Sequence, residues 1–534
     1  MATQRHGFLQ SLSPLCLLEQ VFDLCYPSIQ RVVFKLFKPP PPPGPDYLKN
    51  PKGRIAVIGA GLTGVSSAAH AIANGFEVVI YEQDDKIGGI WANVNKTSAI
   101  QFHAMLYRFF PGVRWTSSCP KRDEILSEIT RVWKEYHLEP RTRLNTPVTS
   151  VKRVKGSGEK VTSDPEHSQS KWIVNGGVDG VFDAVVCTIG TCGPPLRINV
   201  PGMPEMDQDA SGDSSDDEKK QGIVDAAVFQ GDVMHSSEID GVDFEGKRVI
   251  VIGSGASGVE VVETALEKGA EGCVMLARDE KWIVPRNIVF NTLLSAQLFG
   301  REKFVTSVWE TCVAFLNYRG APELVPARLR LFETTPIANN EFVGLVRDGR
   351  CEYVRCDIER LTRCGVRVKL RGREDKPGEG NKEREIQGDV IVLATGFKKP
   401  AVDFFKDDLF PESYERPNLY MHSFSTEDWS VMMTNSTYEH GLATAGHFHI
   451  GIYMRILLTF LMDPATRPTE KDMKLWVDAK RRKRTDTLRF FTYMEMVVWI
   501  LLFYIFRLDR LKWFFFIMHG WRMYPKDTKK AAAE

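Results

Sequence analysis

The sequence has almost no excess of charge of either sign. Its 534 residues include 69 lysines and arginines against 68 aspartates and glutamates, so the formal net charge at pH 7 is +1. Such a balance gives no electrostatic reason to expect a polyanion as partner. Nucleic acid is therefore not expected among the ligands.

Cysteines are few and show no regular framework. The ten of them are scattered along the chain, which favours reduced, buried thiols in a reducing compartment. Cys351, Cys356 and Cys364 come closest to a cluster, but they lie in strand-like sequence without nearby histidines. No metal site is expected there or elsewhere.

Uninterrupted hydrophobic runs long enough for a bilayer are also missing. Residues 8–37 are apolar but broken by Glu19 and Asp23, and no small-residue cleavage site follows, so they predict an amphipathic helix rather than a secretory signal. The prolines at 39–43 predict a stiff spacer. The C-terminal run 490–506 is shorter than the roughly 20 residues of a usual span and contains Glu495.

The two ends nevertheless favour a membrane surface. Basic residues at 480–484 precede the C-terminal run, which is rich in Trp, Tyr and Phe. This pattern is typical of a helix lying in a membrane interface, and the alternative is a helical hairpin buried on the protein itself or in a dimer. We expect an intracellular protein associated through its termini with the cytosolic face of the endoplasmic reticulum or another membrane. A homodimer is a possible assembly.

The sequence does contain an internal repeat of one pattern. "IAVIGAGLTGVSSAAHAIANGFEVVIYEQ" begins at Ile55, and "VIVIGSGASGVEVVETALEKGAEGCVMLAR" begins at Val249. Each passes from a β-branched segment through glycines into a helical stretch and back to a strand, and each half closes on a strand followed by Thr-Ile-Gly or Thr-Gly. Alternating strands and helices predict an α/β fold with two Rossmann-like dinucleotide-binding domains and parallel central sheets.

The first glycine motif predicts a dinucleotide site. Gly59 permits a tight turn, Gly61 lets the backbone approach a pyrophosphate, and Gly64 lets helix and strand pack closely. The helix N-terminus adds N–H donors and a positive dipole end. Glu82 closes the next strand about twenty residues on, where a carboxylate accepts the ribose hydroxyls of an adenosine.

The second motif repeats this arrangement with Gly253, Gly255 and Gly258, but Arg278 stands where the first copy has Glu82. A guanidinium grips a 2′-phosphate that a carboxylate would repel, so this site predicts NADP(H), with an ordinary surface arginine as the alternative. Two dinucleotides in one chain indicate electron transfer between a nicotinamide and a flavin.

Three further stretches carry a family resemblance: "GGIW" at 88–91, "FQGDVMHSS" at 229–237 and "LATGF" at 393–397. With both glycine motifs they closely resemble the flavin-containing monooxygenase superfamily, including its Baeyer–Villiger and plant auxin-synthesis branches, from about residue 54 to 461. Ile239 departs from the aromatic residue that usually closes the second stretch.

The resemblance implies FAD at the first glycine site, NADPH at the second, and molecular oxygen as co-substrate. It adds a set of residues to those that contact the cofactors: Gln83, Trp91, Val148, His235 and Ser236. His235 and Ser236 would lie at the domain junction.

The activity implied is a monooxygenase that forms a flavin hydroperoxide and inserts one oxygen atom into a small lipophilic substrate. N- or S-oxygenation is favoured, with Baeyer–Villiger oxidation of a ketone as the alternative. Asn95, Gln101 and His103 are the candidates for the polar lining of the catalytic site, each with a structural hydrogen-bonding role as the alternative.

Two rivals share parts of this pattern. A flavin disulfide reductase would need a cysteine pair beside the flavin, and Cys187 and Cys192 fall on and beyond the strand that closes the first half. A catalytically degenerate, membrane-attached homologue would bind nucleotide without turnover.

The motifs divide the chain into six predicted parts. They are an N-terminal amphipathic segment and spacer (1–49), the first part of an FAD-binding domain (50–204), an acidic disordered loop (205–222), an NADP-binding domain (223–396), the return part of the FAD domain (397–462) and a helical, membrane-prone segment (463–534).

Overall fold

The chain folds into two compact units. The computed structural model describes residues 14–37, 41–42, 44, 48–101, 103–155, 169–204, 228–295, 303–331, 333–434, 440–441, 448–483, 490–491 and 493–521. The first unit comprises Met1–Gly193, Arg286–Glu302 and Lys399–Glu534, and the second comprises Pro194–Pro285 and Lys303–Lys398. The first unit is thus assembled from three separate stretches of sequence. The predicted acidic loop at 205–222 lies outside the described residues.

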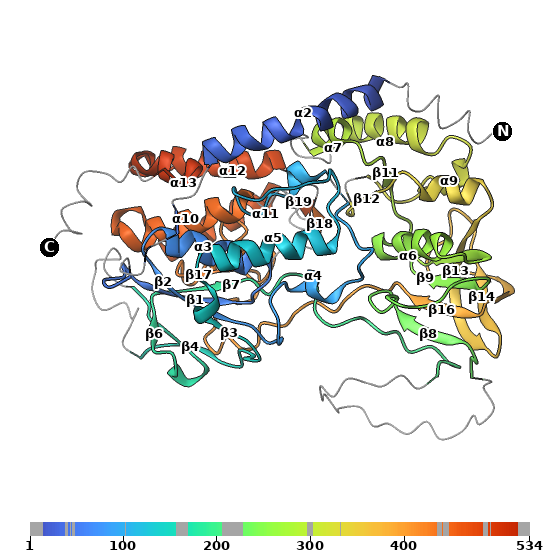
Figure 1. Ribbon diagram of the computed structural model, residues 1–534, viewed down its shortest axis with the longest axis horizontal. Coiled ribbons are helices and arrows are strands. Elements are labelled where there is room, and N and C mark those ends of the chain that lie inside the picture. Colours follow the sequence, from blue (N-terminus) through green and yellow to red (C-terminus); the bar gives the residue numbers. More distant parts are fainter. Residues whose placement is uncertain are drawn as a thin grey trace. The chain divides into compact units, whose positions relative to one another are not determined.

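A parallel five-stranded sheet forms the centre of the first unit (Figure 1). Its spatial order is β17 (Val431–Met432), β7 (Ala184–Cys187), β1 (Arg54–Ile58), β2 (Glu77–Tyr81) and β3 (Thr142–Arg143). The chain order of the strands reverses between β1 and β7, and the carboxyl-end crevice at such a reversal is where open α/β sheets bind ligands. The apolar sequence of β1 is buried along Ile55–Ile58, as expected for a strand covered on both faces.

Helices cover this sheet. All twelve residues of α3 (Leu62–Ala73) are buried, and its alanines and serines allow α10 (Phe448–Met462) to pack directly against it. Helix α5 (Arg122–Glu135) also contacts α3. A separate antiparallel sheet is formed by β4 (Val151–Arg153), β5 (Trp172–Val174) and β6 (Val181–Phe182).

The second unit repeats the same plan around a seven-stranded sheet. Its parallel strands lie in the order β13 (Cys351–Thr362), β10 (Gly272–Ala277), β9 (Arg248–Ile252), β16 (Val390–Leu393) and β8 (Asp232–His235). Two antiparallel strands, β14 (Gly365–Leu370) and β15 (Lys382–Gln387), extend it beyond β13. Helix α6 (Ala256–Glu267) joins β9 to β10. The predicted α/β class with parallel sheets is confirmed.

Helices also lie near both ends of the described part of the chain. The end of helix α2 (Pro14–Phe37) contacts the segment of α13 (Phe514–His519), where Trp521 Nε1 donates to the carbonyl of Leu36 at 3.2 Å, and α12 (Tyr493–Ile505) precedes α13 in the chain (Figure 1). None of the helices in the described part of the chain has the length and apolar character needed to cross a bilayer.

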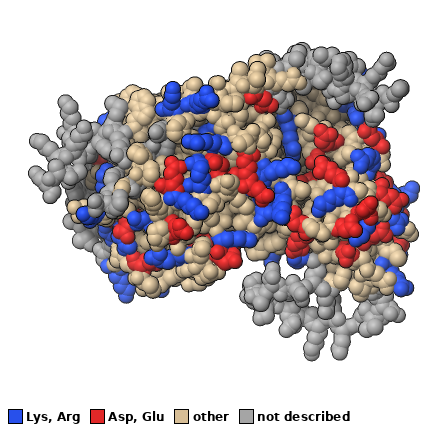
Figure 2. Space-filling model, in the orientation of Figure 1, with Lys and Arg blue, Asp and Glu red and all other residues tan. Residues whose placement is uncertain are grey.

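Charges of both signs are mixed over the face drawn in Figure 2. Lysines and arginines lie next to aspartates and glutamates over the part of that face the structure describes. This distribution agrees with the net charge of +1 and presents no broad field for a polyanion.

Candidate dinucleotide sites

The turn after β1 can be built only from glycine at two positions. Gly59 has φ of +102°, and a Cβ there would lie 2.9 Å from the carbonyl oxygen of Thr188. A Cβ on Gly64 would lie 1.9 Å from the carbonyl oxygen of Gly59. Because both obstacles are backbone atoms, no side-chain movement would relieve them. The turn therefore brings α3 against β1 and β7 as closely as the motif predicts.

The turn after β9 has the same construction. Gly253 has φ of +119°, and its Cβ would lie 2.3 Å from the carbonyl oxygen of Ala394. A Cβ on Gly258 would lie 2.2 Å from the carbonyl oxygen of Gly253. The amide of Ala394 donates to Ile252 as that of Thr188 donates to Ile58, both at 2.8 Å. The two halves of the sequence repeat therefore make the same backbone hydrogen bond at their glycine turns.

The middle glycine of each motif is not required by the packing of the protein. Gly61 and Gly255 directly precede α3 and α6 as their N-cap residues, and no side chain caps either helix N-terminus. A Cβ on Gly255 would meet nothing within 4 Å, and one on Gly61 would lie an ordinary 3.6 Å from Gly89 Cα. Open space before an uncapped helix N-terminus is what a pyrophosphate needs in order to approach the backbone. Both turns therefore fit a dinucleotide.

The Glu82 carboxylate lies against the first turn. Its Oε2 accepts a hydrogen bond from the Ala60 amide at 2.6 Å, and Oε1 accepts one from the Asp84 amide at 3.1 Å. Its side chain is buried, and this burial raises the pKa of Glu82, while the backbone hydrogen bonds oppose the rise. A carboxylate fixed between the glycine turn and the end of β2 fits the predicted role of accepting ribose hydroxyls.

The position assigned to Arg278 is corrected by one residue. Gly59 donates to the carbonyl of Tyr81 at 2.7 Å, and Gly253 donates to that of Leu276 at 2.9 Å. In this register the counterpart of Glu82 is Ala277, and Arg278 is the counterpart of Gln83. The second helix–strand connection is one residue longer than the first, and Arg278 lies one residue beyond the true counterpart of Glu82.

Arg278 also has a partner within the protein. Its side chain is 78% exposed, and its Nε lies 3.3 Å from Oδ2 of Asp279. Arg371 Nη2 donates to the Ala277 carbonyl at 3.1 Å and also to that of Arg278, so the backbone at the end of β10 is held in place. The second site thus lacks an acid at the ribose position and carries a basic residue at its rim.

His235 is the last residue of β8 and Ser236 follows it, and the ring of His235 lies next to Gly396. His235 Nε2 is 3.0 Å from the carbonyl oxygen of Gly396, and its Nδ1 accepts from the Ser237 amide at 3.2 Å. The amide of Leu196 donates to the same Gly396 carbonyl at 2.8 Å. His235 therefore braces the segments near two of the four points where the chain passes between units. Burial lowers the pKa of His235, which favours the neutral ring.

Of the other residues predicted to contact the flavin, Trp91 belongs to a segment beside the first turn, and Gln83 directly follows Glu82. Gly61 forms a bridge with Gly88, which brings the segment of Trp91 beside the turn. Trp91 Nε1 donates to the hydroxyl of Tyr107 at 2.7 Å. Gln83 is exposed after Glu82, and Val148 packs at the edge of the core. Tyr107 was not predicted, because nothing in the local sequence marks it as a partner of the tryptophan.

The three candidates for the catalytic lining have different surroundings. Asn95 is buried after α4 (Ile90–Asn93), and its carbonyl accepts from the Ser98 amide at 3.0 Å. Gln101 is half-buried. His103 is buried, but both its ring nitrogens are used by the protein, one by the Met105 amide at 3.0 Å and the other by Asp23 at 3.1 Å. The predicted catalytic role of His103 is therefore replaced by a role in binding α2.

The two glycine turns at the switch points of two parallel sheets define a protein with two dinucleotide-binding domains. The sequence profile described as "Pyridine nucleotide-disulphide oxidoreductase" matches residues 53–289. Among curated relatives, a Baeyer-Villiger monooxygenase of Pseudomonas aeruginosa is 25% identical over 48% of this chain and 43% of its own. Flavin-containing monooxygenase 5 of Homo sapiens is 24% identical over 69% of this chain and 68% of its own.

A third relative is dimethylaniline monooxygenase [N-oxide-forming] 2 of Rattus norvegicus, 25% identical over 70% of this chain and 66% of its own. The chain spans less than half of the first relative and about two thirds of the other two.

Solved structures share the fold. Oxidized steroid monooxygenase bound to NADP has a TM-score of 0.61 at 16% identity and covers 86% of this chain and 98% of its own. OTEMO in complex with FAD and NADP has a TM-score of 0.57 at 17% identity and covers 83% of this chain and 92% of its own. The chain is thus similar in sequence to flavoprotein monooxygenases and shares their fold.

The disulfide-reductase alternative has no support in the structure. The nine cysteines whose side chains the structure describes are free thiols. Cys187 is buried within β7, where desolvation raises the pKa of its thiol to about 12, so it is protonated and unreactive at neutral pH. Cys192 is exposed.

Proposed function

We propose that the protein is a monooxygenase that uses FAD at the first glycine turn and NADPH at the second, together with molecular oxygen. The observation that carries the proposal is the difference between the two turns. The first has a buried carboxylate at Glu82, and the second has Ala277 at that position followed by Arg278. One site thus suits a dinucleotide with a free ribose, and the other tolerates a 2′-phosphate.

The helix N-termini, Glu82 and the segment around Asn95 each have a separate role in the proposed reaction. The N-termini of α3 and α6 bind the pyrophosphates through backbone N–H groups. Glu82 accepts the ribose hydroxyls, and the buried segment around Asn95 shields the reacting centre from water. When bound, the flavin and nicotinamide supply the electron transfer and the activation of oxygen. The protein need only bind, orient and exclude solvent.

For the substrate, we favour N- or S-oxygenation of a small lipophilic compound. The relative named for N-oxide formation and flavin-containing monooxygenase 5 align with 69–70% of this chain, whereas the Baeyer-Villiger relative aligns with 48%. Baeyer–Villiger oxidation of a ketone is the alternative, supported by the relative named Baeyer-Villiger monooxygenase.

We also propose that the first unit lies on a membrane surface, at the cytosolic side of the endoplasmic reticulum or another membrane. Helix α2 turns Asp23, Tyr26 and Gln30 toward the protein. Its outer face and the C-terminal helices expose large apolar side chains that would contact the lipid: Val21, Leu24, Val32, Leu36, Leu501, Ile505, Phe506, Leu508, Leu511, Phe515 and Trp521. A homodimer stays a prediction.

The test of the proposed activity is a rapid-mixing measurement on the full-length protein in mild detergent. Bound flavin should be visible, NADPH should bleach it without oxygen, and reoxidation should pass through a long-lived absorbing species that a tertiary amine or thioether discharges. A ketone that discharges it instead would favour the Baeyer–Villiger alternative. If the protein binds nucleotide but NADPH never reduces a bound flavin, the alternative of a catalytically degenerate homologue would be supported.

A further inference from the structure

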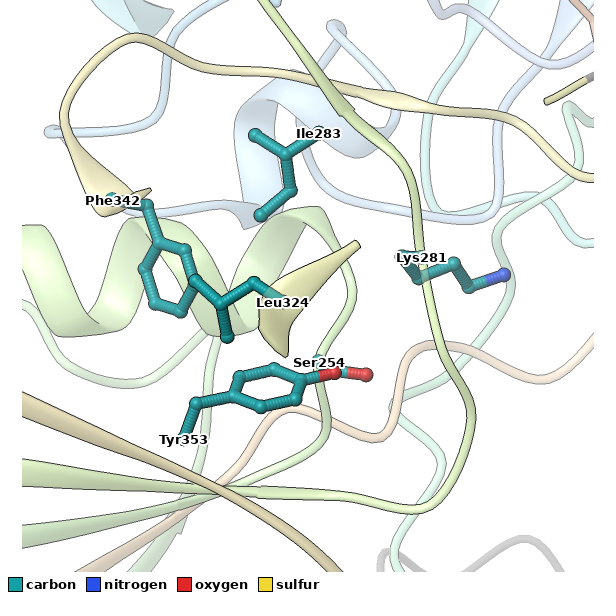
Figure 3. A pocket seen from close by; sticks show the side chains of 6 residues that line it. All are labelled: Ser254, Lys281, Ile283, Leu324, Phe342 and Tyr353. Atoms are coloured by element: carbon teal, nitrogen blue, oxygen red, sulfur yellow. The ribbon is translucent and has the colours of Figure 1, made fainter. Parts of the chain in front are cut away.

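A shallow hollow lies beside the second glycine turn, within the second unit. It is lined by Ser254 from the turn together with Lys281, Ile283, Leu324, Phe342 and Tyr353, and encloses about 250 Å³ including its open side. In Figure 3 the aromatic and aliphatic side chains form its walls. The Lys281 ammonium points away from these walls, to the same side as the Ser254 hydroxyl.

The backbone around Lys281 is fixed on both sides. The Ser254 hydroxyl donates to the carbonyl of Asp279 at 2.7 Å, which ties the segment to the glycine turn. Immediately after Lys281, Trp282 Nε1 donates to the carbonyl of Leu329 at 2.7 Å, and the amide of Ile283 donates to Tyr318. The lysine therefore projects from a rigid segment at a set position relative to the turn.

The other charges of this segment are already paired. Glu280 contacts Arg355, with Oε1 3.0 Å from Nε, and accepts from the Ala327 amide at 2.9 Å. Asp279 pairs with Arg278. Lys281 is half-buried and makes no hydrogen bond or ion pair with any residue that the structure describes. Burial lowers the pKa of Lys281, and Asp279 opposes this shift, so the site favours a further anion.

We propose that Lys281 is the fixed cation that recognises the 2′-phosphate of the nicotinamide dinucleotide, while Asp279 holds Arg278 at the rim. This inference rests on the proposed function and names the residue that sets its coenzyme selectivity. A 2′-phosphate carries close to two negative charges at neutral pH and would provide the counter-charge that Lys281 lacks. The Ser254 link places this charge next to the turn that binds the pyrophosphate.

The experiment is calorimetric titration of the full-length protein with adenosine 2′,5′-bisphosphate and with adenosine 5′-monophosphate, which differ only in the 2′-phosphate. Wild type should prefer the bisphosphate. Lys281→Met should lower that preference by about tenfold, the effect of losing one charge-assisted contact, without changing the Kd for the monophosphate. Lys281→Arg should keep most of the preference, and Lys382→Met on β15 should behave as wild type.

A pH series adds a second readout. The preference of wild type should grow from pH 5 to pH 7 as the 2′-phosphate loses its second proton near pH 6, and this growth should be reduced in Lys281→Met. An unchanged preference in Lys281→Met, or equally weakened binding of both nucleotides, would overturn this inference but not the proposed function. Wild-type protein that binds neither nucleotide would overturn the second dinucleotide site, and with it the proposed function.

Discussion

The imidazole of His103 joins the N-terminal helix to the first domain through Asp23. The Met105 amide donates to Nδ1 of the ring, so Nε2 carries the proton and donates to Asp23 Oδ1 at 3.1 Å. The rings of Phe22 and Tyr26 pack edge-on against the imidazole, with ring centroids 5.1 and 4.8 Å from its own. Burial lowers the pKa of His103, with Asp23 opposing the shift, and the neutral ring agrees with this hydrogen-bond pattern.

Replacing Asp23 should therefore loosen α2 without disturbing the cofactor sites. Since Asp23 is 41% exposed, Asp23→Ala should cost less than about 1 kcal/mol of global stability. Hydrogen exchange across residues 14–37 should nevertheless become faster, while any flavin spectrum stays the same. Arg31→Ala, on the exposed side of the helix, is the control. A changed flavin spectrum in Asp23→Ala would restore His103 to the catalytic site.

The two later glycines of the second motif should respond differently to alanine. Gly258→Ala places a Cβ 2.2 Å from a backbone oxygen, so it should lower the melting temperature by several degrees or prevent folding. Gly255→Ala meets no protein atom within 4 Å and should melt as wild type. It should nevertheless weaken NADPH binding about tenfold or more, because the pyrophosphate needs that space. Equal NADPH affinity in Gly255→Ala and wild type would mean that the pyrophosphate lies elsewhere.

Releasing Arg278 from Asp279 should raise the preference for a 2′-phosphorylated coenzyme. Asp279→Asn removes a negative charge near the 2′-phosphate and frees the guanidinium, so the Kd for NADPH should fall several-fold while that for NADH changes little. Arg347 and Asp348 form the same kind of neighbouring pair, with Nε and Oδ1 3.2 Å apart, and Asp348→Asn is the matched control. Parallel changes for both coenzymes would show that the pair does not face the ribose.

Acid should destabilise the first unit through His449. Burial lowers the pKa of this histidine from an ordinary 6.5 to about 4, so the fold holds it neutral while the unfolded chain takes up a proton. The stabilisation is present above pH 6.5 and is lost as the pH falls from 6.5 to 4, by about 3 kcal/mol in total.

His449→Gln should therefore reduce the dependence of the unfolding free energy on pH within this window, measured by denaturant titration at several pH values. His137→Asn, at an exposed position, should leave the dependence as in wild type. Identical pH profiles for His449→Gln and wild type would show that His449 is accessible to water in the folded protein.

Local spacing was enough to predict the two glycine turns. Gly59 and Gly64 are separated by a fixed number of residues, so the clash that excludes other side chains arises within one turn and does not depend on distant sequence. The class of fold followed for the same reason, since strand and helix periodicities are local. Arg278 was misplaced by one residue because its register is set by hydrogen bonds between β9 and β10. These strands are neighbours in the sheet but are separated in the sequence by α6.

The sequence by itself determined the two α/β domains, the order of their motifs and the turns where phosphates would approach, because each depends on neighbours along the chain. Only the tertiary structure decided that His103 binds Asp23, that Arg278 pairs with Asp279, and that Lys281 lines the hollow beside Ser254. These partners and surroundings arise from packing between segments and from backbone register. A side chain's chemistry can be read from its letter, but its partners depend on what the folded chain brings within hydrogen-bonding distance.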